Sequence, residues 1–253
     1  MGCEILRERT AQTVTISQTR YIKSVKNLRS VPHDLSRTLD KSENHPSVYE
    51  NAPYREAVGS LMWASVMTRF DIANAVREVA KYSGNPKVTH WCAVKCILAY
   101  LNTCPSVGLR FGGFDTECEL SAYADASYAG DWNDRRSVTG RVISWMPKVQ
   151  RVVALSLLES EYIALSSVAQ ELLFLRSVFE FIQPKLPRRC IDLFEDNDGA
   201  CKLVQNATRT KHIDVRHNFL RDLSRKREIR VVFVGTANQR ADVLTKNLPV
   251  RVF

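Results

Sequence analysis

Four acidic residues stand where an α/β fold would bring them together: Asp125, Glu161, Asp196 and Asp242. Asp125 ends a segment of alternating apolar residues, and Asp196 follows a second β-prone segment, so we expect both at strand ends. Glu161 and Asp242 each open a segment with helical spacing, so we expect both at helix starts. Because strand ends and helix starts converge on one side of an open α/β sheet, these four carboxylates are predicted to meet there.

Carboxylates gathered in this way suit metal chemistry. They repel one another unless a hard dication lies between them, and Mg²⁺ prefers such oxygen ligands. Two ions about 4 Å apart can activate a water molecule and stabilise the leaving oxygen of a phosphodiester. Spacing alone leaves a simpler alternative open, in which Glu161 and Asp242 only interact with a helix dipole, each contributing under about 1 kcal/mol.

The composition narrows the class of protein. With 253 residues, 45% hydrophobic and 25% charged, the chain is long enough for one or two globular domains and is not disordered, collagenous or a coiled coil. The net charge of +9 is typical of proteins that meet a polyanion, most often nucleic acid. No uninterrupted apolar run of about 18 residues occurs, so no membrane partner is expected. Seven scattered cysteines without a Cys-x-x-Cys pair favour an intracellular compartment, with cytoplasm and nucleus both open.

Hydrophobic spacing predicts the elements that hold the acids. A short strand is expected at 12–16, a weakly structured connector at 27–53, and three helices within 54–104. From residue 120 on, strands and helices alternate, which is typical of an α/β fold. The strands are expected at 120–125, 149–158, 190–194 and 228–234, and the helices at 160–182, 199–205, 213–227 and 241–248.

The sequence motifs around the four acids resemble those of the ribonuclease H domain in copia-type LTR retrotransposon Pol polyproteins. The matching segments are 123–131, 134–140, 153–156, 159–165, 195–200, 209–217 and 239–246. Upstream, 54–62, 68–73 and 90–95 resemble the region that joins reverse transcriptase to ribonuclease H, and 16–18 and 21–22 resemble the end of the polymerase part. No Tyr-x-Asp-Asp motif, which the polymerase part would carry, occurs in the sequence, so the chain is not expected to synthesise DNA.

The resemblance implies an α/β fold with a ribonuclease H-like mixed sheet flanked by helices, preceded by a small helical connection region. It divides the chain into a remnant of the reverse transcriptase end and linker at 1–53, a helical connection region at 54–112 and a ribonuclease H-like domain at 113–250. Gly140 runs almost directly into 142–145, where the family has a further strand and a glycine-rich turn, a gap of about eight to ten residues. We therefore expect the sheet to lack one strand, leaving an unpaired edge beside the strand of Asp125.

The resemblance also implies roles for individual residues. Asp125, Glu161, Asp196 and Asp242 correspond to the catalytic, metal-binding carboxylates, with two Mg²⁺ ions as cofactor and Mn²⁺ as a substitute. The implied substrate is the RNA strand of an RNA–DNA hybrid, recognised by backbone, groove shape and 2′-hydroxyls. Other retrotransposon Pol products are further candidate partners. The candidate phosphate-binding residues are Arg135, Arg136, Arg209, Lys211, Arg225 and Lys226, although each also fits a solvated basic face.

Two main functions remain open from the sequence, and a polymerase accessory that needs a partner subunit is a third, weaker alternative. One is an RNA–DNA hybrid ribonuclease that hydrolyses the RNA strand by two-metal-ion catalysis, impaired to the extent that the internal deletion displaces Asp125. The alternative is a non-catalytic, degenerate retroelement fragment that acts at most as a basic nucleic-acid-binding module. The position of Asp125 relative to the other three carboxylates distinguishes them.

Overall fold

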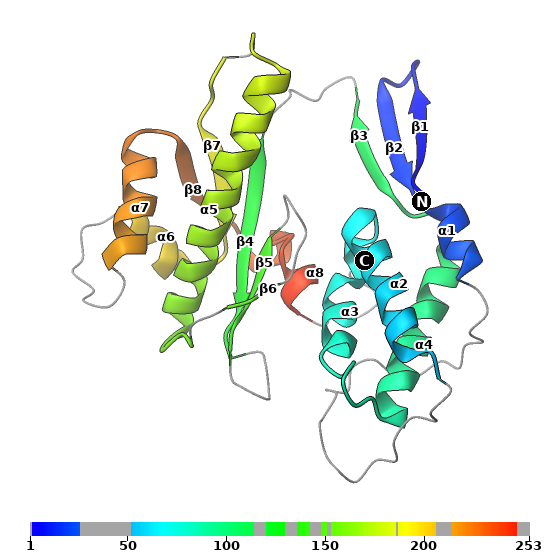
Figure 1. The fold of residues 1–253 in the computed structure, drawn as a ribbon. Coiled ribbons are helices and arrows are strands. Elements are labelled where there is room, and N and C mark those ends of the chain that lie inside the picture. The colour runs from blue at the N-terminus through cyan, green and yellow to red at the C-terminus, as the bar shows by residue number, and fades with distance from the viewer. Residues whose placement is uncertain are drawn as a thin grey trace. The chain divides into compact units, whose positions relative to one another are not determined.

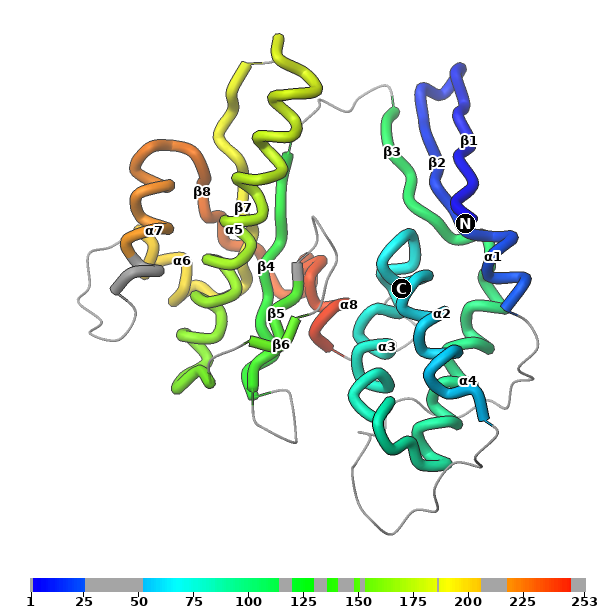
Figure 2. The backbone as a smooth tube through the Cα atoms, in the orientation of Figure 1, coloured from blue at the N-terminus to red at the C-terminus, as the bar shows by residue number. Residues whose placement is uncertain are grey.

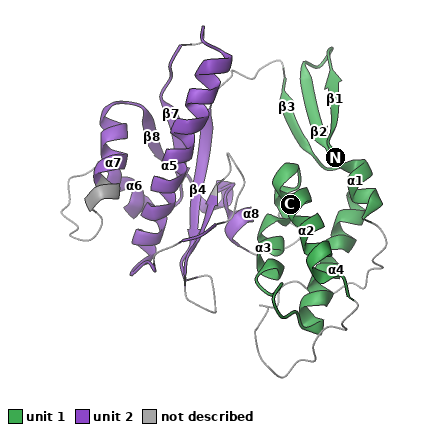
Figure 3. Cartoon of the chain, viewed as in Figure 1, with its two compact units in different colours: residues 1–117, 249–253 green, residues 118–248 purple. Residues whose placement is uncertain are grey.

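The chain folds as two compact units, residues 1–117 with 249–253, and residues 118–248 (Figure 3). The three predicted segments, 1–53, 54–112 and 113–250, stay a prediction. The structure is a computed structural model. It describes residues 2–25, 52–113, 120–129, 136–141, 148–150, 153–185, 187–205 and 214–246.

The first unit combines a small antiparallel sheet with a group of helices (Figure 1). The sheet has the order β1-β2-β3, and the predicted strand at 12–16 is its central strand β2. The three helices predicted within 54–104 are confirmed, and their apolar stripes form the core of this unit. The elements are β1 Glu4–Glu8, β2 Thr13–Ser17, α1 Thr19–Ser24, α2 Tyr54–Met67, a 3₁₀ turn Phe70–Ile72, α3 Ala73–Ala80, α4 Val88–Thr103 and β3 Leu109–Gly112.

A buried arginine and its aspartate partner link the turn before α3 to helix α4 in the first unit. The fully buried Arg69 guanidinium lies 2.7 Å from Asp71, and its Nη1 donates to the carbonyl oxygen of Cys104 after α4. The Tyr100 hydroxyl donates to the same Asp71 carboxylate. A buried charge needs such partners. The residue types in the segment 68–73 are therefore explained by contacts within this unit.

The second unit is built on a five-stranded mixed sheet with the order β6-β5-β4-β7-β8 (Figures 1 and 2). Neighbouring strands run antiparallel from β6 to β4 and parallel from β4 to β8. This is the predicted α/β fold with a mixed sheet flanked by helices. The elements are β4 Ser121–Ser127, β5 Val138–Arg141, β6 Lys148–Val149, α5 Leu157–Ile182, β7 Ile191–Glu195, α6 Asp198–Gln205, α7 Asp214–Arg225, β8 Ile229–Phe233, a 3₁₀ turn Thr236–Asn238 and α8 Asp242–Thr245.

The prediction that the strand of Asp125 has lost its neighbour is wrong. Strand β4 pairs on one side with β5, where Asp125 lies opposite Gly140, and on the other side with β7. The short sequence between 140 and 148 leaves β5 and β6 brief instead of removing the partner strand. The strand expected at 149–158 is also mostly wrong, because among the described residues of this range only Val149 is strand, at the end of β6, and α5 already begins at Leu157.

Helix α5 is the central helix of the second unit and packs along β4. Ala122 and Ala124 of β4 are fully buried in a core shared with Leu165 and Leu172 of α5. Among the described residues, α5 is the one helix long and apolar enough to cross a membrane by length and composition, and half of its apolar window is buried inside this unit. Its apolar character follows from its central position in the core.

A glycine in β5 lets the last helix approach the sheet. A Cβ atom on Gly140 would lie 2.8 Å from Cγ2 of Thr245 and 2.9 Å from the carbonyl oxygen of Ala241. Real Cβ atoms do not come this close to a backbone oxygen. Because side chains alternate along a strand, Asp125 faces away from the Ala124 side of β4 and toward α8. Gly140 therefore allows α8 to contact the face that carries Asp125.

We expect Gly140→Ala to displace α8 and to lower the free energy of unfolding by about 1–3 kcal/mol, the usual cost of overpacking. Gly235→Ala is the matched control, because a Cβ at Gly235 meets no atom within 4 Å. It should change stability by less than about 0.5 kcal/mol. Urea denaturation of both variants measures the difference, and equal midpoints would contradict the close packing of α8 on β5.

Candidate active site

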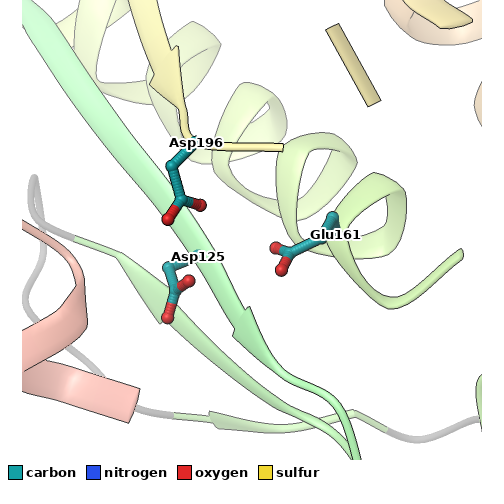
Figure 4. A group of neighbouring side chains, drawn as sticks. All are labelled: Asp125, Glu161 and Asp196. Atoms are coloured by element: carbon teal, nitrogen blue, oxygen red, sulfur yellow. The ribbon is translucent and has the colours of Figure 1, made fainter. Parts of the chain in front are cut away.

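Three of the four predicted carboxylates meet in the second unit. Asp125 comes from β4, Glu161 lies one turn inside α5, and Asp196 directly follows β7. One ligand atom from each lies within 4.8 Å of the others (Figure 4). Asp125 and Glu161 are almost fully buried, whereas Asp196 is half-buried. Their predicted catalytic and metal-binding roles stay a prediction.

Local caps fix two of these carboxylates. The Ser156 hydroxyl accepts a hydrogen bond from the backbone N–H of Glu159, which starts α5 and sets the turn that carries Glu161. The Asn197 side chain accepts one from the N–H of Ala200 at the start of α6, so the turn that holds Asp196 is fixed as well.

The fourth predicted carboxylate, Asp242, lies beside Asp125 on the α8 side. Asp242 is the buried first residue of α8, and its Oδ1 lies 2.6 Å from the ammonium nitrogen of Lys246. The same ammonium lies 3.6 Å from Asp125. The Thr245 hydroxyl donates a short hydrogen bond to the Asp125 carboxylate. The four predicted acids therefore form one continuous group, with Lys246 between the last and the first.

Burial dominates the electrostatics of this group. It raises the pKa of Asp125 to about 6, although the Thr245 hydrogen bond and the Lys246 charge act in the opposite direction. Burial, followed by the charges of Asp125 and Asp196, raises the pKa of Glu161 to about 9. Without a cation, burial therefore favours the protonated forms of Asp125 and Glu161 more than water would.

A further buried acid, Glu195, belongs to this region and was not among the predicted site residues. Its side chain is fully buried at the end of β7. Burial and the neighbouring Glu161 charge raise its pKa to about 10. The signal in the sequence is alternation, because Ile191, Leu193 and Glu195 share the core-facing side of β7. An acid at such a position marks a site or a buried network.

The residues fit a hard divalent cation. Oε2 of Glu161 and Oε2 of Glu195 are both buried and have no hydrogen-bond partner among the described residues. A buried carboxylate oxygen without a partner is costly, and coordination to a metal ion removes that cost. Since every donor in the group is a carboxylate oxygen, the group suits Mg²⁺ or Mn²⁺ better than a softer metal.

The predicted phosphate-binding residues are only partly described. Arg136 is exposed just before β5, and Arg225 is exposed at the end of α7. Lys226 pairs with Asp222 at 2.6 Å, which satisfies its charge locally. The other three, Arg135, Arg209 and Lys211, lie outside the described residues. Binding of nucleic acid by these six residues stays a prediction.

Comparison with known proteins identifies retroelement relatives of this chain. No family model matches the chain. The Pol polyprotein of the Nicotiana tabacum transposon TNT 1-94 is 37% identical over 276 aligned residues, which cover all of this chain and 20% of that protein. A secreted RxLR effector protein of Plasmopara viticola is 42% identical over 133 residues, covering 50% of this chain and 93% of that protein.

A solved structure is also similar, the ribonuclease H1 of Halobacterium salinarum, with 19% identity and a TM-score of 0.31 over 50% of this chain and 93% of that one. The sheet order and the flanking helices define the second unit as an α/β domain with a mixed sheet, and its sequence relatives are retrotransposon Pol polyproteins. The chain belongs to the family of copia-type retrotransposon Pol polyproteins and spans about a fifth of the length of the tobacco relative.

The raised pKa values predict how pH affects the stability of the metal-free protein. A carboxyl group whose pKa is higher in the folded protein stabilises the fold when protonated, and this contribution is lost as pH rises from the unfolded pKa toward the folded one. For Glu161 this window runs from 4.5 to about 9. In EDTA, the melting temperature should therefore fall as the pH is raised from about 5 to about 9.

Glu161→Gln removes this titration, so its melting temperature at about pH 8 should exceed that of the unsubstituted chain in EDTA. The control Glu180→Gln changes an exposed glutamate on the same helix and should keep the original pH slope. Differential scanning calorimetry measures all three proteins. If the melting temperature depended on pH equally in the unsubstituted chain and in Glu161→Gln, the burial of this carboxyl group would be contradicted.

Proposed function

We propose that the second unit is a ribonuclease that hydrolyses the RNA strand of RNA–DNA hybrids with two Mg²⁺ ions. The observation that carries the proposal is the convergence of Asp125, Glu161 and Asp196 from β4, α5 and β7 within 4.8 Å. Buried carboxylates that approach this closely need a cation to remain ionised together. The family membership supports phosphodiester hydrolysis as the reaction that such a cation serves.

In this proposal the protein supplies the geometry. Asp125, Glu161 and Asp196 would hold the divalent ions, and Asp242 would complete the ligand set on the α8 side. When bound, the ions activate water for attack on phosphorus and stabilise the leaving oxygen. The Thr245 hydrogen bond orients the Asp125 carboxylate, and the Asn197 cap holds the turn that carries Asp196. Metal-ion catalysis depends on such fixed ligand positions.

The substrate class follows from charge and family. The chain carries a net charge of +9, which favours a polyanionic substrate. Exposed Arg136 and Arg225 would contact the phosphates of the hybrid, and such contacts position a duplex without reading its sequence.

The test is cleavage of a hybrid with a labelled RNA strand by the purified chain in Mg²⁺. We expect cleavage of the RNA strand, none in EDTA, and none of duplex DNA. Asp196→Asn should reduce cleavage by at least about 100-fold, because even outer-sphere changes cost about 10–100-fold at metal sites. The matched control is Asp192→Asn on β7, which removes a surface ion pair with Arg230 of β8 and should lower cleavage less than about threefold.

The opposite result has a distinct signature. Hybrid binding that weakens steeply with salt, without any cleavage in Mg²⁺ or Mn²⁺, would contradict the ribonuclease and identify the nucleic-acid-binding module instead. Equal loss of cleavage in the Asp196 and Asp192 variants would also contradict the assigned site.

A further inference from the structure

Lys246 places a fixed positive charge inside the acidic group. It directly follows α8, and its backbone N–H donates to the carbonyl oxygen of Asp242, which closes the single turn of this helix. Its ammonium then lies 2.6 Å from Oδ1 of Asp242 and 3.6 Å from Oδ1 of Asp125. The side chain is 39% exposed, so it reaches the carboxylates from the solvent side.

This lysine divides the acidic group into two unequal halves. On one side, Asp125 and Asp242 share the ammonium. On the other side, Glu161 and Asp196 form no ion pair within the described part of the chain, and Oε2 of Glu161 also lacks a hydrogen-bond partner there. Asp125 belongs to both halves. The ammonium therefore contacts the carboxylates at one end of the group and acts on Glu161 and Asp196 at the other end only from beyond ion-pair distance.

A divalent cation meets different conditions at the two ends. At the Glu161 and Asp196 end it gains two ligands that form no ion pair within the described residues, and it shares only Asp125 with the ammonium. At the Asp242 end it must displace an ammonium that already holds the same oxygens, since two cations cannot share them at contact distance. The displaced side chain has room to leave, because Lys246 is partly exposed.

We propose that Lys246 is a positioning residue that holds Asp125 against Asp242 and makes the two metal positions unequal. The position formed by Asp125, Glu161 and Asp196 takes a divalent cation first, and the position formed by Asp125 and Asp242 takes a second one only when the ammonium is displaced. This inference rests on the proposed function, because it concerns the same metal site. In this inference, Lys246 determines which of the two metal positions is filled first.

Isothermal titration calorimetry with Mn²⁺ on the full chain, without substrate, tests this order. The unsubstituted chain should show one tight and one weak site. In Lys246→Met the second site should tighten by at least about tenfold, because the competing charge is gone, while the first changes less than about threefold. Lys246→Arg keeps the charge and should retain the weak second site. Lys81→Met is the control, since it removes a lysine from another ion pair, with Glu78 at 3.0 Å, in the first unit.

The outcomes separate this inference from the proposed function. Two Mn²⁺ sites whose affinities are the same in the unsubstituted chain and in Lys246→Met would overturn the inference and leave the ribonuclease proposal standing. Absence of Mn²⁺ binding in every variant would overturn both. If Lys246→Met does not fold, Lys246→Arg decides: a second site tightened by tenfold despite the retained charge overturns the inference, and an unchanged weak site supports it.

Discussion

Repulsion among buried carboxylates is the constraint on which the second unit depends. Asp125, Glu161 and Glu195 are almost fully removed from water, and the half-buried Asp196 lies beside them. Ionising all of them together is costly in a medium of low dielectric constant. Without a metal ion, burial raises the pKa values of Asp125, Glu161 and Glu195, and one lysine lies at the Asp242 end. This arrangement is compatible with a divalent cation between the carboxylates.

The scaffold explains how such a group is assembled from distant parts of the sequence. Parallel pairing of β4 with β7 sets the strand of Asp125 beside the strand that precedes Asp196, and packing of α5 on β4 brings in Glu161. The α8 contribution depends on Gly140, which lets a single helical turn contact β5. Short β5 and β6 are sufficient for this purpose, because the two residues that matter, Asp125 and Gly140, lie opposite each other in the ladder.

Much of this arrangement could be predicted from the sequence. Alternation and helical spacing indicated the α/β fold and the elements that carry Asp125, Glu161 and Asp196, because these patterns reflect burial on one face. The continued pairing of β4 could not be predicted, since a gap in a family pattern does not tell whether a strand is lost or shortened. Glu195 and Lys246 were also missed, because their importance comes from tertiary neighbours, Glu161 and the Asp125–Asp242 pair, rather than from local spacing.

The most direct test of the account is to locate a divalent cation in the protein. Crystals grown with Mn²⁺ should give an anomalous scattering peak within coordination distance of carboxylate oxygens of Asp125, Glu161 and Asp196. The peak should be present in the unsubstituted chain and absent in Asp196→Asn. A well-ordered structure in millimolar Mn²⁺ with no peak at these three carboxylates would contradict the central claim that this buried acidic group is a metal site.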